Sequence, residues 1–102
     1  MIKHIVMWTL LDNAEGNNKT ENAKMLKIKL EALPSQIPVI KYFEVGINNP
    51  KTSGNFDVVL ISHFNSWQDL DTYINHPIHK ELGSFVSKIR KDRAVVDFEK
   101  SE

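Results

Sequence analysis

The chain has 102 residues, of which 41% are hydrophobic, so we expect a single domain over residues 1–102 with a modest core. Thirteen basic residues balance thirteen acidic ones and cysteine is absent, which argues against nucleic-acid and anionic-membrane binders and excludes disulfides, zinc–thiolate sites and a thiol nucleophile. The sequence has neither a secretory signal nor the apolar run of about 20 residues that spans a bilayer, so we expect a cytoplasmic protein.

The first predicted element is a strand over residues 2–11, in which nearly every residue is apolar. Alternation along a strand sends successive side chains to opposite faces. One face would carry Ile2, His4, Val6, Trp8 and Leu10, and the other Ile5, Met7 and Leu11. Because both faces are apolar, we expect this strand to be buried on both sides.

A helix over about residues 19–33 is predicted next. Asn18 and Glu21 have the spacing of a capping box, and Pro34 ends the helical pattern. Residues 13–18, which precede the helix, are expected to form a loose loop. The apolar side chains that recur at helical spacing are Leu26, Leu30, Leu33 and Ile37.

Two further strands are predicted over residues 41–48 and 56–64, with turn-forming residues at 49–54 between them. The second of these strands is apolar on both faces. Val58 and Leu60 lie on one face, and Val59 and Ile61 on the other.

A broken helix is predicted after the third strand. Ser66 can cap its first part, with Asp69 three residues later. His76 and Pro77 break it, because proline lacks a backbone N–H and pushes the preceding residue out of helical geometry. A short strand over residues 94–98 follows. The inward-facing side chains of the two helical parts would be Leu70, Tyr73, Ile74, Leu82, Phe85, Val86 and Ile89.

This order of elements predicts an α+β fold of the ferredoxin-like, split βαβ type (βαββαβ) with a four-stranded antiparallel sheet. The helices would cover one face of the sheet. The other face would expose Ile5, Met7, Val59 and Ile61 in a monomer. We therefore expect a homodimer through the sheet face, in which two sheets meet to form a dimeric α/β barrel.

Three titratable side chains are candidates for chemistry. His4 lies on the strand face that meets the helices, so it would point into the same interior as Tyr73 and His79. Histidine can act as a base or an acid, and a tyrosine hydroxyl can hold a developing oxyanion. The alternative is that both histidines are core residues satisfied by backbone carbonyls and that the tyrosine hydroxyl lies at a rim.

The remaining histidines suggest structure rather than chemistry. The ring of His76 can bond the backbone groups that Pro77 leaves free at the bend. A metal site made from His76 and His79 would need further ligands, and the proline between them would make the rings diverge, so we expect no metal and no cofactor. His63 would face the dimer side or the surface.

Tyr73, His76-Pro77 and His79, following the opening strand at residues 2–8, form a pattern that resembles the stress-responsive A/B barrel (Dabb) family of dimeric alpha-beta barrels. The resemblance covers the whole chain. The family that this chain resembles includes plant proteins induced by stress, bacterial members without an established activity, and a plant polyketide cyclase. In the cyclase the second histidine of the motif is the general base and the tyrosine its partner, and these map onto His79 and Tyr73. Its amino-terminal pocket histidine maps onto His4.

The chain departs from that cyclase at three places. Val58 stands where the cyclase has a further histidine, Leu26 and Leu30 where it has aromatic residues, and Arg90 or a neighbour where it has a tryptophan. The pocket should therefore differ in shape, and a long-chain polyketide is a poor expectation. Some plant relatives hold magnesium with backbone carbonyls in the segment matching residues 34–40, which the sequence leaves open.

We expect each protomer to enclose a small apolar pocket around His4, Tyr73 and His79. Its walls would be Val6, Trp8, Leu26, Leu30, Leu60, His76, Leu82 and Phe85. The first functional hypothesis is a stress-associated protein whose pocket takes a small apolar ligand or is filled by side chains. The second is a cofactor-independent lyase or isomerase acting on a carbonyl compound, with His79 as base and Tyr73 as partner. A quinone-forming monooxygenase of the wider superfamily shares the topology but not the motif.

Overall fold

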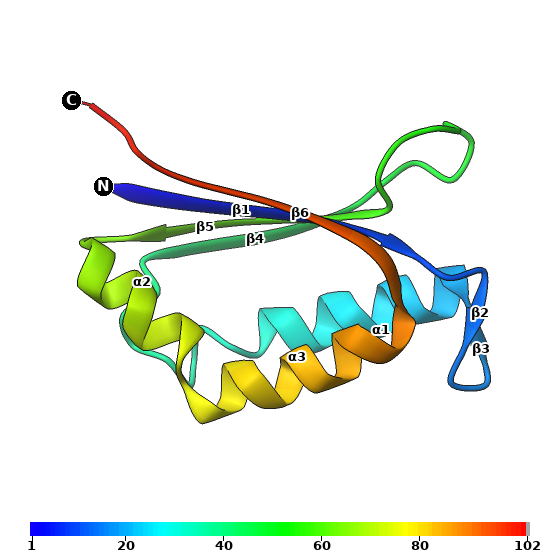
Figure 1. Cartoon of the computed structure of the whole chain (residues 1–102), viewed down its shortest axis with the longest axis horizontal. Coiled ribbons are helices and arrows are strands. Elements are labelled where there is room, and N and C mark those ends of the chain that lie inside the picture. Colours follow the sequence, from blue (N-terminus) through cyan, green and yellow to red (C-terminus); the bar gives the residue numbers. More distant parts are fainter. Residues whose placement is uncertain (102) are drawn as a thin grey trace.

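The computed structural model describes residues 1–101 and builds them into one sheet, a small hairpin and three helices (Figure 1). The elements in chain order are β1 (Ile2–Leu10), β2 (Asn13–Ala14), β3 (Asn17–Asn18), α1 (Lys19–Glu31), β4 (Tyr42–Ile47), β5 (Val58–Phe64), α2 (Trp67–Ile74), α3 (Pro77–Ile89) and β6 (Arg90–Glu99). None of the helices in residues 1–101 is long and apolar enough to cross a bilayer.

Polar side chains begin the first two helices where the sequence predicts. The side-chain oxygen of Asn18 accepts a hydrogen bond of 2.8 Å from the Glu21 N–H, and the Glu21 carboxylate accepts one of 3.0 Å from the Asn18 N–H. This reciprocal pair is a capping box. The Ser66 hydroxyl accepts a bond of 3.1 Å from the Asp69 N–H and caps α2 in the same way.

The predicted break between α2 and α3 is also confirmed. Pro77 is the first residue of α3, where its missing N–H costs nothing. His76 is extended and caps α3, because its Nδ1 accepts a hydrogen bond of 3.1 Å from the Ile78 N–H. The His76 ring is therefore a helix cap.

The main sheet has the strand order β4-β5-β1-β6, and all of its neighbouring strands are antiparallel. Helices α1 and α3 lie side by side on one face, and the opposite face carries no helix (Figure 1). The predicted ferredoxin-like α+β fold is confirmed.

The inner face of the sheet, which meets the helices, carries alternate residues of every strand. On β1 these are Ile2, His4, Val6, Trp8 and Leu10, all buried. On β5 they are Val58, Leu60, Ser62 and Phe64, also buried. The helices complete this core with Leu26, Leu30, Leu70, Tyr73, Leu82, Val86 and Ile89.

The outer face is the opposite side of the sheet, and within the protomer it is only partly covered. It carries Ile5, Met7, Val59, Ile61, Ala94, Val96 and Phe98. Val96 is 53% and Phe98 40% exposed, and Met7 is exposed as well. The expectation that β1 is buried on both sides is wrong for a single protomer, because none of the helices in residues 1–101 covers the face that carries its odd-numbered side chains (Figure 1).

The structure differs from the prediction in the loop at residues 13–18 and at the end of the first helix. Residues 13–18 form the β2–β3 hairpin, in which Glu15 and Gly16 both have positive φ, as a two-residue turn of type I′ requires. The buried Asn22 side chain ties this hairpin to α1 by donating a bond of 3.0 Å to the Ala14 carbonyl. The first helix ends at Glu31, slightly before the expected position.

The last strand is longer than the segment 94–98 expected from the sequence. β6 begins at Arg90, directly after the last residue of α3, and runs beside β1 over its whole length. Its charged opening residues hide it from a search for apolar alternation. An edge strand tolerates such charges, since one side of it faces solvent.

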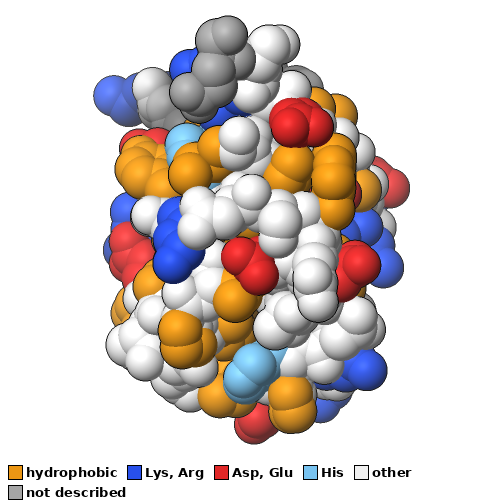
Figure 2. Space-filling view, turned by 90° about the vertical axis from the view of Figure 1, so that its left-hand side faces the viewer, with side chains coloured by type: hydrophobic (Ala, Val, Ile, Leu, Met, Phe, Trp, Pro, Cys, Tyr) orange, Lys and Arg blue, Asp and Glu red, His pale blue; other side chains and the backbone are white. Residues whose placement is uncertain are grey.

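The charges of the protein are mixed on the face that Figure 2 shows, where Asp and Glu side chains lie among Lys and Arg side chains. This agrees with the equal numbers of basic and acidic residues in the sequence.

Candidate functional site

The inner pocket is a cavity of about 290 Å³ between the inner face of the sheet and α3. Its buried end includes Tyr73 and Leu60, and its other end includes the exposed residues Ser87, Arg90 and Arg93. The pocket therefore opens to solvent beside the start of β6. Its lining residues are His4, Val6, Trp8, Leu30, Leu60, Tyr73, His79, Leu82, Gly83, Val86, Ser87, Arg90 and Arg93.

Tyr73 is at the centre of an aromatic cluster. Its ring centroid lies 4.5 Å from that of His79, 5.1 Å from Phe64 and 6.0 Å from His4. The side chain is fully buried, and its hydroxyl has no hydrogen-bond partner within residues 1–101. Burial raises the pKa of Tyr73 well above its usual range, so the hydroxyl stays protonated and can donate a hydrogen bond.

His79 is held by the break between the two helices. Its Nδ1 lies 3.0 Å from the carbonyl oxygen of Ile74, the last residue of α2. A carbonyl can only accept, so Nδ1 carries the proton and Nε2 of the neutral ring has a free lone pair. Burial lowers the pKa of His79, the Ile74 hydrogen bond opposes this, and the nearby charges of His4 and Arg93 add to the lowering. The ring is therefore neutral at neutral pH and can accept a proton.

His4 is held by hydrogen bonds to its side chain and to its main chain. Its Nδ1 is hydrogen-bonded to the carboxylate of Asp97, which lies directly opposite on β6, and its carbonyl accepts a bond of 3.1 Å from the Ser62 hydroxyl. The carboxylate fixes the proton on Nδ1 and orients the ring edge-on to Tyr73. Asp97 is a partner that the sequence analysis missed, because only the register of β6 against β1 brings it to His4.

Most of the expected walls line the inner pocket, and three do not. Val6, Trp8, Leu30, Leu60 and Leu82 are lining residues. Leu26 is fully buried in the core behind them, because its position on α1 points it at the sheet. Phe85 lies under the ammonium group of Lys29, at 5.0 Å from its ring centroid. His76 is occupied as the cap of α3.

Five lining residues were not among the expected walls. Gly83, Val86 and Ser87 lie on α3, and Arg90 and Arg93 lie on β6. The helical spacing of Val86 with Leu82 was visible in the sequence. The resemblance pointed to Arg90 or a neighbour as the position of the cyclase tryptophan, whereas Arg93 could be found only from the point at which β6 begins, which the charged sequence does not mark.

The described residues offer little to a metal ion. Residues 1–101 contain no group of three or more His, Cys, Asp or Glu side chains placed to hold one. In the turn after α1, the Leu33 carbonyl already accepts bonds from the Gln36 and Ile37 N–H groups, and the Ile37 carbonyl accepts one from Ile40. These carbonyls stabilise the turn, and a cation within residues 34–40 stays a prediction.

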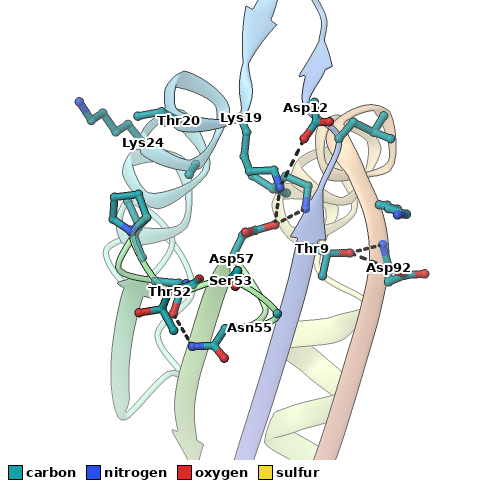
Figure 3. Close-up of a pocket in the computed structure, with 18 residues that line it drawn as sticks. Thr9, Asp12, Lys19, Thr20, Lys24, Thr52, Ser53, Asn55, Asp57 and Asp92 are labelled. Carbon is teal, nitrogen blue, oxygen red and sulfur yellow. Dashed lines mark hydrogen bonds and ion pairs between the residues drawn. The ribbon is translucent and has the colours of Figure 1, made fainter.

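A second cavity is larger, at about 1010 Å³, and lies between α1, the loop that joins β4 to β5, and the start of β6 (Figure 3). We call it the loop groove. Its central Asp57 accepts a hydrogen bond of 2.8 Å from the Leu10 N–H. Lys19 lies between two carboxylates, 3.5 Å from that of Asp57 and 3.6 Å from that of Asp12. The polar groups at its centre satisfy one another and tie loop to strand, which indicates a structural role.

Comparison with known proteins identifies relatives over the whole chain. A family model described as Stress responsive A/B Barrel Domain matches residues 2–100. A dimeric protein of unknown function with a ferredoxin-like fold, from Bacteroides fragilis, is 35% identical over 96% of this chain and 94% of that one, with a TM-score of 0.82. No curated protein matches the sequence.

Two more distant structures show a shared fold. A dimeric ferredoxin-like protein of unknown function from Thermobifida fusca is 23% identical over 95% of this chain and 88% of that one, with a TM-score of 0.81. A hydroxynitrile lyase from Passiflora edulis is 16% identical over 99% of this chain and 94% of that one, with a TM-score of 0.78.

Proposed function

Because the chain belongs to the stress-responsive A/B barrel domain family, we propose that it is a homodimer that binds a small ligand in the inner pocket of each protomer. The ligand is mostly apolar and has one hydrogen-bond acceptor, such as a carbonyl oxygen. Its location in the cell, expected to be cytoplasmic, stays a prediction from composition.

The outer face supports the dimer. Its apolar side chains lie on three neighbouring strands, and a monomer would leave them in contact with water. The similar proteins from Bacteroides fragilis and Thermobifida fusca are both described as dimeric. A second copy of the same face is the economical cover, since two-fold dimers are the commonest assembly of soluble proteins.

The unpartnered Tyr73 hydroxyl carries the ligand proposal. A buried hydroxyl without a partner costs roughly 1–3 kcal/mol, so proteins rarely leave one unless something else binds it. This hydroxyl belongs to a residue that lines a cavity of about 290 Å³, at the lower end of the size range of small-molecule sites. A ligand with an acceptor atom beside Tyr73 would satisfy the hydroxyl and fill the cavity.

The ligand proposal is tested with small neutral ketones such as cyclohexanone and phenylacetone, added to isotope-labelled protein while amide resonances are recorded. We expect saturable shifts at Leu60, Tyr73 and Leu82, and weaker binding in Tyr73→Phe. Tyr42→Phe is the matched control, because Tyr42 is the other tyrosine of the chain and lies on the exposed edge strand β4. Absence of saturable shifts at the inner pocket, or equal binding by both variants, would contradict the proposal.

A second candidate function is proton abstraction from a carbon next to a carbonyl. His79 favours it, because its lowered pKa and its Nδ1–Ile74 bond leave a basic Nε2 beside Tyr73. Nε2 would take the proton, the electron pair would pass into the carbonyl to form an enolate, and the Tyr73 hydroxyl would donate a hydrogen bond to the enolate oxygen. At least one protein with this fold is an enzyme, the hydroxynitrile lyase of Passiflora edulis.

Exchange of the phenylacetone α-protons for deuterium separates this candidate from plain binding. A general base contributes about 10²–10⁴-fold in rate, so His79→Gln should lower the exchange rate by at least about 100-fold while the ketone still binds. His63→Gln is the control, since His63 lies on the outer side of β5 against Tyr42. If wild type and His79→Gln exchange at the same rate, His79 is not the base.

A further inference from the structure

Two arginines, Arg90 and Arg93, stand at the solvent end of the inner pocket. Arg90 is both the C-cap of α3 and the first residue of β6, because the strand follows the helix without a loop. The opposite end of the pocket is formed by apolar side chains such as Val6 and Leu60. The cavity thus has a mostly apolar floor, which includes the Tyr73 hydroxyl, and a cationic mouth.

The strand register directs Arg93 toward the pocket. Arg93 lies directly opposite Trp8 in the antiparallel β1–β6 ladder. Residues that face each other in such a ladder project to the same side of the sheet, and Trp8 is buried on the inner face. Arg93 therefore lies on the helix side of the sheet, at the edge of the cavity.

The positive charge at the mouth is not paired with a carboxylate of residues 1–101. Within residues 1–101 neither Arg90 nor Arg93 forms an ion pair, whereas Lys19 and Lys27 do. Asp97, which lies farther along β6 opposite His4, is hydrogen-bonded to that histidine. Burial is the main cause that lowers the pKa of His79, and the positive charge of Arg93 adds to the lowering.

We propose that the inner pocket binds a small oxo carboxylic acid as its anion, with the carboxylate on Arg90 and Arg93, the oxo group as acceptor for the Tyr73 hydroxyl and the apolar body along the buried walls. This inference rests on the proposed function, since it names the class of ligand for the same pocket. A guanidinium matches a carboxylate with two parallel hydrogen bonds. A free phosphate could use the arginines but would leave the apolar walls uncovered, which favours the carboxylic acid.

The test compares hexanoate, hexanamide and inorganic phosphate as ligands of the full-length protein, with amide resonances as the readout. We expect hexanoate to bind about tenfold more tightly than hexanamide, as a charge-assisted hydrogen bond should provide. Arg90→Gln and Arg93→Gln should each reduce this preference. Lys88→Gln should leave it unchanged, because Lys88 lies on the exposed last turn of α3 and does not line the pocket.

Salt gives a second readout that does not depend on a variant. Raising the salt concentration from about 0.05 M to about 0.5 M screens exposed charges, so it should weaken the binding of hexanoate and not that of hexanamide. The same titrations report folding, since a misfolded variant loses the dispersion of its spectrum.

The outcomes separate the two proposals. Equal binding of hexanoate and hexanamide would overturn the carboxylate inference and leave the ligand pocket standing. Binding of phosphate in preference to hexanoate, or a preference that survives both arginine variants, would also overturn it. Absence of binding by every probe, the neutral ketones included, would contradict the proposed function itself.

Discussion

The two faces of the sheet use the same strands for different purposes. Leu60 and Ile61 are neighbours on β5, yet Leu60 is buried beneath the helices and Ile61 lies on the outer face, only half-buried. The inner face is completed by α1, α2 and α3 and still leaves a cavity with an unpartnered hydroxyl. The outer face is apolar and is only partly covered by residues 1–101. One face is thus suited to a ligand and the other to a second protomer.

The larger of the two cavities is the weaker candidate for a ligand-binding site. The loop groove has more than three times the volume of the inner pocket, but its central groups, Asp57, Lys19 and Asp12, satisfy one another. The inner pocket is small, and its Tyr73 hydroxyl has no partner within residues 1–101. Because buried polar groups are rarely left unsatisfied, the Tyr73 hydroxyl makes the inner pocket the better candidate for a binding site.

The largest expected effect is on the outer face, where Ile61→Asp should convert the dimer to monomers. Each protomer would bury one unpaired carboxylate in the interface, at a cost of about 3–5 kcal/mol per charge. Light scattering measures the mass. Ile28→Asp is the control, because Ile28 is 69% exposed on α1 and should leave the dimer intact. A dimer that survives Ile61→Asp would show that the outer face is not the interface.

The next effect concerns the inner face, where Leu60→Ala should lower the free energy of unfolding by about 2–5 kcal/mol. Leu60 is 2% exposed, so its removal leaves a cavity against the helices. Urea denaturation measures the change, and Ile28→Ala should cost far less. A Leu60→Ala variant as stable as Ile28→Ala would mean that the inner face is not the core.

Tyr73→Phe should keep or increase the stability of the fold while weakening the binding of ligands. The change removes a hydroxyl that is buried without a partner, and such a group costs roughly 1–3 kcal/mol in the empty protein. Thermal unfolding measures the stability, with Tyr42→Phe as the control. A clear loss of stability in Tyr73→Phe would indicate that the hydroxyl has a partner in the free protein.

The smallest effect is the pH dependence contributed by His79. Its pKa in the folded protein lies below the ordinary value of 6.5, so below that value the unfolded chain binds the proton more readily. Stability should therefore fall as the pH drops from 6.5 to the lowered pKa of the folded state. Urea denaturation across this pH range should show the loss in wild type and not in His79→Gln. An equal loss in both proteins would place the cause elsewhere.

Local signals in the sequence predicted most of the fold. The Asn18–Glu21 capping box, the Ser66 cap and the break at Pro77 each depend on residues close together in the chain. The alternation of side chains along β1 and β5 is also a local signal, and it predicted which residues lie on each face of the sheet. The β2–β3 hairpin was missed because it has only two residues in each strand.

The candidate site was predictable only where its residues lie on elements that the sequence marks. Tyr73 and His79 come together because the helix breaks between them, and that break is visible in the sequence. Asp97, Arg90 and Arg93 reach the site through the register of β6 against β1, which depends on packing between distant parts of the chain. A hydrophobic pattern can fix a strand register, but the charged opening residues of β6 supply little of that pattern.

The four histidines allow the central claim, that the inner face binds ligand and the outer face binds a partner, to be tested in one measurement. His79 lines the inner pocket, and His63 lies on the outer side of the sheet. Imidazole nitrogen resonances of histidine-labelled protein should show that ligand shifts His79 and leaves His63 unchanged, whereas Ile61→Asp shifts His63 and preserves the ligand response of His79. Ligand shifts at His63 with none at His79 would contradict the account.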